Sequence, residues 1–347
     1  MKEHFDPTPI LKKSLNEIGC RGILLGVSEN GHIETYSAGS IPEEDHNRPY
    51  YIYSISKSFT AVAIMKLCEE QGDFLDQPFF SFFPDAKIPH TITVRQMLNH
   101  TSGLSDYFSS AEYKTALKES PDEPWSYEKL MNFGIKNTPL FEAGNGWSYS
   151  NPGYALLKEL VEKKSGMDSY EYVNKIIIDK IQLKNTRPFL EVDRNSELLE
   201  GEDDSFEGDF RLQYQPGWIA TSCYISTVSD VARFYDALFG GKLLSAESVA
   251  EMIKTVGVLA SPPAESIPTY GLGLMHHKNS PLGDGYGHGG GGPGYSTYAV
   301  HYPDLNGSSF TVSLVLNKNL PQFPFGLPDE IVRNYIETRA KEHSKPE

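Results

Sequence analysis

A serine and a lysine stand three residues apart at the start of an apolar stretch, "YIYSISKSFTAVAIMKL" (51–67). Residues three apart on a helix lie on one face, with Cβ atoms roughly 5–6 Å apart, so Lys57 can reach the hydroxyl of Ser54. Burial lowers the pKa of a lysine, and a neutral amine can accept a proton. A serine hydroxyl becomes a useful nucleophile only when an adjacent base activates it. The pair therefore has the composition of an acyl-transfer site.

The Ser-x-x-Lys spacing is not specific by itself, because Ser126 and Lys129 repeat it. Ser126 follows Pro124-Trp125 and precedes an amphipathic pattern, so we predict that it is the N-cap of a helix. Ser54 could equally be only a cap on this evidence. The interpretation therefore depends on other stretches of the chain.

Two further stretches supply groups that such a site needs. "GNGWSYSNPGYALL" (144–157) places Tyr149 and Asn151 in a loop before a helix, where a tyrosine can relay protons and an amide can hold a lysine and a substrate. "GYGHGGGGPGYSTYAV" (285–300) places His288 and four glycines at the start of a strand, where a backbone N–H can face an oxyanion. The alternatives are a turn with a packed aromatic residue and a flexible turn with a solvated histidine.

Taken in order, these motifs resemble the three-motif set of the penicillin-recognising serine hydrolases. They are most similar to the class C β-lactamase-like branch, which includes DD-peptidases, D-aminopeptidases and esterases. Four other stretches are similar to that family: "ITVRQMLNHTSGLSDY", "FEAGNGWSYSNPGYALLKELVEKKSG", "ISTVSDVARFYDAL" and "YGLGL". The resemblance extends over roughly residues 15–320.

The resemblance implies catalytic roles for four residues. Ser54 is expected to be the acylated nucleophile, and Lys57 and Tyr149 are expected to share the proton transfers, with the identity of the base left open. His288 is expected to act where β-lactamases have the lysine of Lys-Thr-Gly.

The resemblance also implies a set of substrate-binding groups. Asn151 is expected to position the substrate and the lysine, and Gly290 and Gly291 are expected to line the site. The backbone N–H groups of Ser54 and Gly291 would form the oxyanion hole. No cofactor and no metal are implied.

Three departures from the family pattern bear on the substrate. His288 replaces a lysine, as in peptidase-like and esterase-like members. Gly289 and Gly291 carry no hydroxyl, and each missing hydrogen bond to a desolvated carboxylate costs roughly 1–3 kcal/mol. We therefore expect poor recognition of penicillin or of a D-Ala-D-Ala terminus. Ser222-Cys223 stands where relatives often have a Gly-Gly pair, and the sequence gives no functional reason for it.

The sequence thus predicts a serine hydrolase that works through a Ser54 acyl-enzyme on a small ester, a lactone, or a D-amino-acid amide or peptide. Four aromatic residues suit either an apolar acyl pocket or the core: Tyr107, Trp147, Trp218 and Tyr295. Two alternatives remain: a β-lactamase with weak or broad activity, and a sensor or scaffold that is acylated without turnover. The expected partner is a small-molecule or peptide substrate.

Composition excludes several other classes. The 347 residues are 39% apolar and 22% charged, as in a globular domain. The net charge of −15 argues against binding to nucleic acid or to an anionic membrane. No run of about 18 apolar residues predicts a membrane span. We expect a cytoplasmic protein if the chain starts natively at Met1, and an extracytoplasmic one if a signal peptide was removed. The oligomeric state stays open.

The cysteines and the remaining histidines do not form a recognisable site. Cys20, Cys68 and Cys223 are far apart and odd in number, so they indicate neither a disulfide framework nor a zinc site. The pair 276–277 and His301 lack metal-ligand spacing with carboxylates, and we expect them at surface or strand positions.

The hydrophobic patterns predict an α+β fold. A helix to about Ile18 and a hairpin through Asn30-Gly31 precede a buried helix from about Ser54 to Gly72. The chain then reads as mainly helical to about 255. Strands follow at 270–278, 294–303 and 308–319, before a terminal helix at 328–343. We expect a single domain, 1–347, in which N- and C-terminal segments (about 1–75 and 256–347) form one antiparallel sheet with flanking helices around an inserted, mainly helical region (about 76–255).

Overall fold

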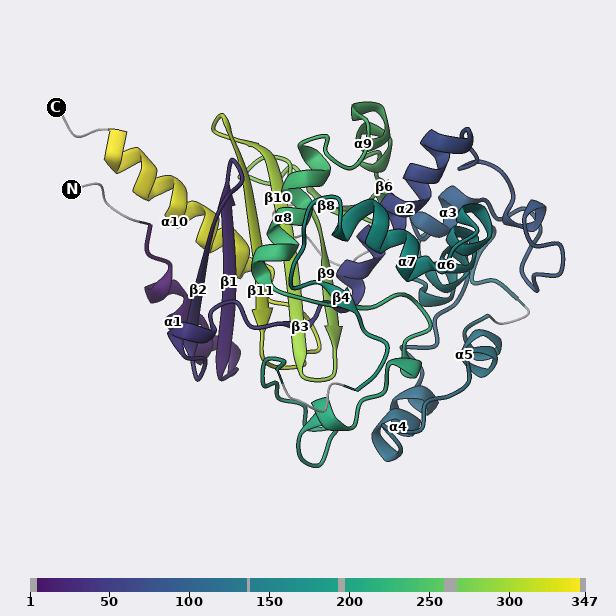
Figure 1. Cartoon of the computed structure of the whole chain (residues 1–347), viewed down its shortest axis with the longest axis horizontal. Helices are drawn as coiled ribbons and strands as arrows, with labels where there is room; N and C mark the ends of the chain where they lie inside the picture. The colour runs from purple at the N-terminus through teal and green to yellow at the C-terminus, as the bar shows by residue number, and fades with distance from the viewer. Residues whose placement is uncertain (1–4, 136–137, 193–196, 259–266, 344–347) are drawn as a thin grey trace.

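The computed structural model describes residues 5–135, 138–192, 197–258 and 267–343, and an eight-stranded antiparallel sheet is its largest element (Figure 1). The strand order is β2-β1-β11-β10-β9-β8-β7-β6. The strands are β1 (Gly22–Glu29), β2 (His32–Gly39), β6 (Val256–Gly257), β7 (Ile267–Tyr270), β8 (Met275–Lys278), β9 (Tyr286–Gly292), β10 (Tyr295–Leu305) and β11 (Ser308–Leu316). Strand β1 pairs with β11. The structure therefore confirms that N- and C-terminal segments share one antiparallel sheet.

The first hairpin forms as its turn residues predict. Asn30 and Gly31 join β1 to β2 with φ of 51° and 84°, so both lie in the left-handed region that a two-residue hairpin turn of type I′ requires.

The stretch 270–278 was predicted to be one strand, and that prediction is wrong. It is divided between the end of β7 and all of β8, with a bend at 271–274. The bend depends on two glycines. Gly273 has φ of +70°, and a Cβ on Gly271 would lie 2.1 Å from the carbonyl oxygen of Met252.

Helices cover both faces of the sheet. One face packs against α1 (Thr8–Ile18) and α10 (Gly326–His343), in a cluster that includes Leu11, Leu25 and Ile331. The opposite face packs against α8 (Val228–Phe239) and α2 (Ser56–Gln71), in a second cluster that includes Leu24, Phe59 and Val231. In Figure 1, α1 and α10 lie together near the two termini, and α8 crosses the other face.

The helical region lies beside the sheet and contains α3 (Val94–Leu98), α4 (Ala111–Glu119), α5 (Tyr127–Gly134), α6 (Asn151–Ser165), α7 (Ser169–Val173) and α9 (Ala246–Met252). Ser126 caps α5 by accepting a hydrogen bond from the Lys129 N–H, which confirms its predicted structural role. A small sheet, β3 (Tyr50–Tyr51), β5 (Tyr224–Ser226) and β4 (Arg187–Pro188), was not predicted. Its strands are too short to show an alternating pattern. No helix among the described residues is long and apolar enough to cross a membrane.

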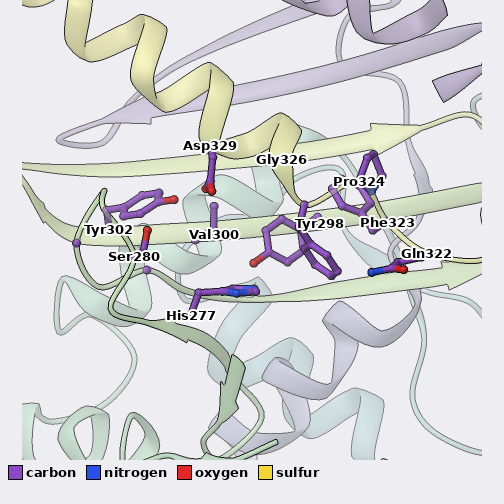
Figure 2. A pocket seen from close by; sticks show the side chains of 13 residues that line it. His277, Ser280, Tyr298, Val300, Tyr302, Gln322, Phe323, Pro324, Gly326 and Asp329 are labelled. Atoms are coloured by element: carbon purple, nitrogen blue, oxygen red, sulfur yellow. The ribbon is translucent and has the colours of Figure 1, made fainter. Parts of the chain in front are cut away.

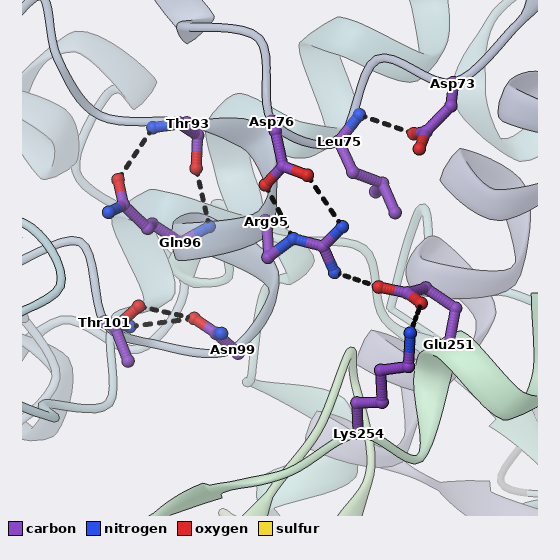
Figure 3. Close-up of polar contacts among 10 residues, drawn as sticks. All are labelled: Asp73, Leu75, Asp76, Thr93, Arg95, Gln96, Asn99, Thr101, Glu251 and Lys254. Atoms are coloured by element: carbon purple, nitrogen blue, oxygen red, sulfur yellow. Dashed lines mark hydrogen bonds and ion pairs between the residues drawn. The ribbon is translucent and has the colours of Figure 1, made fainter.

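An arginine joins α3 to its neighbours (Figure 3). The guanidinium of Arg95 donates to both carboxylate oxygens of Asp76, at 2.7 and 2.9 Å, and also to Glu251 of α9. Thr93 and Gln96 form a capping box at the start of α3. The end of α3 leads directly into the loop 99–106, so this network fixes the base of a loop that reaches the candidate site.

We expect the substitution Gly26→Ala to lower the free energy of unfolding by about 1–3 kcal/mol, because overpacking here involves backbone atoms. A Cβ on Gly26 of β1 would lie 2.7 Å from the carbonyl oxygen of Val228 at the start of α8. Urea denaturation measures the change. Gly257→Ala is the matched control, since a Cβ there meets no atom within 4 Å. Equal stability of the two variants would contradict the prediction.

Candidate active site

Ser54 lies in a 3₁₀ turn, η2 (Tyr53–Ile55), and α2 begins two residues later than predicted, at Ser56. The preceding residue, Tyr53, has φ of 46°, an uncommon conformation for a residue with a side chain. Its hydroxyl donates a 2.5 Å hydrogen bond to the carbonyl oxygen of Pro293 in the β9–β10 turn. Tyr53 thus joins the backbone of the serine turn to a strand 240 residues away in sequence.

Lys57 is buried beside Ser54, as the spacing predicts. Its Nζ lies 3.2 Å from Ser54 Oγ and 2.7 Å from Asn151 Oδ1, and the residue is only 2% exposed. Burial lowers the pKa of Lys57 from 10.5 to about 8, against an opposing effect from the Asp106 carboxylate. Near neutral pH the amine is therefore much closer to losing its proton than an exposed lysine.

Asp106 is a member of this network that sequence reasoning missed. Both of its carboxylate oxygens accept hydrogen bonds from Asn151 Nδ2, each at 3.2 Å. These bonds orient the amide so that its oxygen faces Lys57. Asp106 lies near the end of the stretch "ITVRQMLNHTSGLSDY" (92–107), whose similarity to the family was noted without a role for the aspartate. That stretch was the available signal.

Tyr149 is brought to the same place by the loop before α6. The Lys57 Nζ lies 4.9 Å from the centre of its ring. Burial raises the pKa of Tyr149 well above its usual value, while a side-chain interaction with Ser54 lowers it. The hydroxyl makes no well-formed hydrogen bond within the described part of the chain. A buried hydroxyl without a partner here is consistent with a group that serves a substrate.

His100 supports Tyr149 from behind and was also missed. Its ring centre lies 4.2 Å from that of Tyr149, and its Nδ1 accepts a 3.1 Å hydrogen bond from the Ser150 N–H. Because that bond requires an unprotonated Nδ1, the imidazole is fixed as an acceptor on this side. Burial lowers the pKa of His100 well below its usual value, so the ring is neutral.

The glycines of β9 allow this strand to approach the serine turn closely. A Cβ on Gly290 would lie 2.5 Å from the Ile52 carbonyl oxygen and 3.1 Å from the Ser54 nitrogen. A Cβ on Gly292 would lie 2.7 Å from the ring of Tyr53. Only strand residues without side chains fit at these two positions.

The hydrogen-bond alternation of the hairpin leaves the Gly291 N–H at the free edge of β9. The two-residue loop makes Gly292 and Tyr295 a hydrogen-bonded pair, so Gly291, opposite Ser296, directs its N–H and C=O away from β10. Strand β8 pairs with β9 only at Tyr286 and Gly287. The hairpin pairing therefore leaves the Gly291 N–H free of β10, and the oxyanion hole of Gly291 and Ser54 stays a prediction.

His288 lies near the other groups but turns away from the cavity. Its Nε2 is 2.7 Å from the Tyr270 hydroxyl, and its Nδ1 is 2.5 Å from the carbonyl oxygen of Gly289. The residue is fully buried, and burial lowers its pKa to about 3. The neutral imidazole supports β9 from within the protein. The catalytic role expected for His288 stays a prediction.

A cavity of about 690 Å³ contains Ser54, Tyr149, Asn151 and the glycines 289–292. Of the four aromatic residues proposed as pocket or core, Tyr107 and Trp218 line this cavity. Tyr295 packs in the core against Tyr51 and Phe210. Trp147 stands behind the site, against His100.

Two of the other histidines are paired within the sheet. His276 Nε2 lies 2.9 Å from a carboxylate oxygen of Asp284, and His301 Nδ1 lies 2.7 Å from the Thr311 hydroxyl. Both are buried strand residues, so the surface alternative is wrong for them. No group of three or more potential metal ligands occurs among the residues that the structure describes.

The chain belongs to the β-lactamase family, whose sequence profile, described as Beta-lactamase, matches residues 9–333. Penicillin-binding protein 4* of Bacillus subtilis (strain 168) is 29% identical over 310 residues, which are 80% of this chain and 64% of that protein. The chain thus spans less than two thirds of the length of this relative.

Solved structures show the same fold. A D-stereospecific amidohydrolase from Streptomyces sp. superposes with a TM-score of 0.83 and 26% identity, covering 94% of this chain and 98% of the other. The D-amino acid amidase of Ochrobactrum anthropi SV3 has a TM-score of 0.79 at 22% identity, with 96% and 100% covered.

Burial of Lys57 makes the stability of the fold depend on pH. Its folded-state pKa near 8 lies below the ordinary 10.5, so between these values the unfolded chain binds more protons and stability rises with pH. We expect the free energy of unfolding of the wild type, relative to Lys57→Met, to rise by roughly 2–3 kcal/mol from pH 7 to pH 10. Urea denaturation at each pH measures it.

The control for this experiment is Lys66→Met. Lys66 lies on the surface of the same helix and pairs with Glu69. The free energy of unfolding of the wild type, relative to Lys66→Met, should not rise by a comparable amount between pH 7 and pH 10. Parallel pH curves for the wild type and Lys57→Met would show that burial does not penalise the charged form of Lys57.

Proposed function

We propose that this protein is a serine hydrolase that forms an acyl-enzyme at Ser54, acting on D-amino-acid amides or peptides and on small esters. The observation that carries the proposal is the buried Lys57 amine, which contacts both Ser54 Oγ and Asn151 Oδ1. A buried cation that only stabilised the fold would be paired with a carboxylate. Here its nearest partners are a hydroxyl and an amide.

In the first step, Ser54 Oγ attacks the carbonyl carbon of the substrate and gives its proton to the neutral Lys57 amine, either directly or through the Tyr149 hydroxyl, which accepts the serine proton as it passes its own to Lys57. The carbonyl oxygen becomes an oxyanion that accepts hydrogen bonds from the Ser54 and Gly291 N–H groups. The bond to the leaving group then breaks, and the leaving nitrogen or oxygen takes the stored proton. Water then attacks the carbonyl carbon of the acyl group and gives a proton to the same base. Ser54 Oγ leaves and takes that proton, and the acid product is released.

The choice of substrate follows from what the cavity holds. Tyr107, Tyr113 and Trp218 form an aromatic wall on the side of the helical region, which suits an apolar acyl side chain. The third motif offers glycine backbone and a neutral histidine, and no hydroxyl or cation for a substrate carboxylate. An uncharged amide or ester therefore fits better than a D-Ala-D-Ala terminus. The relatives named for D-stereospecific amidohydrolase and D-amino acid amidase activity support the same choice.

The test compares D-phenylalanine nitroanilide, its L enantiomer and a short-chain nitrophenyl ester, with Ser54→Ala as the blank. We expect turnover of the D amide and of the ester above the blank, and slower turnover of the L amide. Intact-mass spectrometry should show an acyl adduct that Ser54→Ala cannot form. Activity that survives in Ser54→Ala would refute the mechanism. A stable adduct without product would instead favour an acylated sensor, and rapid hydrolysis of a cephalosporin would favour a β-lactamase.

The oxyanion hole is tested by two alanine substitutions in adjacent glycines. In Gly290→Ala the new Cβ meets the Ile52 carbonyl and the Ser54 nitrogen, so β9 must move away from the serine. We expect kcat to fall by about 100-fold or more, as when one oxyanion donor is lost. In Gly291→Ala the Cβ enters open space and the N–H is kept, so the loss should be much smaller. Equal losses in two variants with normal melting temperatures would contradict this geometry.

A further inference from the structure

The catalytic cavity extends to both sides of Ser54. On one side it ends at the aromatic wall of the helical region. On the other side it passes the free edge of β9 and reaches Met275, Ser296 and the segment 320–325, which leads from β11 to α10. An amide substrate also has two sides, the acyl group and the leaving group.

A second cavity of about 550 Å³ lies at the end of this arm (Figure 2). Gln322, Phe323 and Phe325 line both cavities. The rest of the second cavity is formed by residues of β8, the β8–β9 loop, β10 and the start of α10, among them His277, Ser280, Tyr298 and Asp329. The two spaces are therefore neighbours that share one wall.

The alternation of the strands places the far arm of the catalytic cavity and the second cavity on one face of the sheet. Ser296 lies in the catalytic cavity, while Tyr298, Val300 and Tyr302 line the second one. These four residues alternate along β10, so their side chains point to the same face. Met275 and His277 are likewise two residues apart on β8, so their side chains share a face and lie roughly 7 Å apart. Met275 lines the catalytic cavity and His277 lines the second one. The floor is thus continuous from the edge of the serine site to the second cavity.

Strand β9 leaves this floor open beside the serine. Gly289 and Gly291 lie opposite Tyr298 and Ser296 and face the same side. A Cβ on Gly291 would meet no atom within 4 Å, and one on Gly289 would make only ordinary contacts. No side chain at these two positions blocks a chain that passes from Ser54 over β9. Strand β8 begins at Met275 and occupies the edge of β9 from there on. An extended substrate chain must therefore leave the edge of β9 at Met275 and continue over the face of the sheet that packs against α10.

We propose that this arm and the second cavity form the leaving-group subsite, and that the preferred substrates are peptides with an apolar side chain two or three residues beyond the scissile bond. This proposal rests on the proposed function above. The aromatic wall, which includes Tyr113 of α4, suits a single acyl residue, whereas the other arm leads to further space. Tyr298, Phe323 and Phe325 pack together there and offer aromatic surface to an apolar side chain.

The kinetic test uses D-phenylalanyl substrates whose leaving group grows from ammonia to a tetrapeptide that ends in an amide. We expect kcat/KM to rise by about tenfold or more when an apolar residue occupies the second or third leaving-group position, since it is buried there. Val300→Phe fills the second cavity and should abolish the rise, measured against the simple amide in the same variant. Ser280→Trp at the rim is the second blocking variant, and Ser81→Trp, at an exposed site on the helical region, is its control.

A binding test separates this proposal from the proposed function. The leaving-group peptide alone, added to Ser54→Ala, should shift NMR signals of the second cavity, and Val300→Phe should weaken its binding about tenfold. The subsite is refuted if kcat/KM does not depend on the length of the leaving group. It is also refuted if kcat/KM rises with length in Val300→Phe and Ser280→Trp as it does in the wild type. If no substrate is turned over but the peptide still binds in a Val300-dependent way, the proposed function fails and the subsite stands. If the leaving-group peptide does not bind in a Val300-dependent way, the proposed subsite is refuted.

Discussion

The site depends on one constraint, the burial of the Lys57 amine with very few polar partners. Removal of the ammonium group from water is costly, and the cost is met by Asn151, by the face of the Tyr149 ring and by the more distant Asp106 carboxylate. Each of these comes from the helical region, whereas Lys57 belongs to the helix that packs against the sheet and Ser54 to the 3₁₀ turn before it. The buried ammonium group of Lys57 therefore holds the helical region against the sheet. The same burial keeps the Lys57 proton easy to remove.

A second constraint is steric and comes from the sheet. Strand β9 must lie almost in contact with the 3₁₀ turn, and the absence of side chains at Gly290 and Gly292 permits this. The hydroxyl of Tyr53 and the carbonyl of Pro293 hold the two segments together. The same lack of side chains opens the other face of β9 at Gly289 and Gly291. One run of glycines thus provides both close packing on one face and free space on the other.

The sequence predicted those parts of the site that depend on local spacing. Lys57 and Ser54 are three residues apart, and Asn151 and Tyr149 share one loop, so periodicity and family resemblance were sufficient to name them. Asp106, His100 and Tyr53 act through contacts with residues 45 to 240 positions away, which no local pattern reveals. The two- and three-residue strands of the small sheet and the bend at Gly273 were missed for a similar reason, since long-range packing decides them. His288 was correctly placed beside the site, but its inward orientation depends on Tyr270.

The distance in sequence between the two halves of the site has a consequence for synthesis. Ser54 and Lys57 are made well before residues 286–292, the strand that is expected to supply the second oxyanion N–H, and the β10–β11 hairpin beside it follows later still. Until that segment has been made, the serine faces neither Gly291 nor the edge on which a substrate would rest. A growing or prematurely terminated chain therefore carries the nucleophile in an inert form. The order of the strands along the polypeptide delays reactivity until residues 286–292 and the hairpin that follows them have been made.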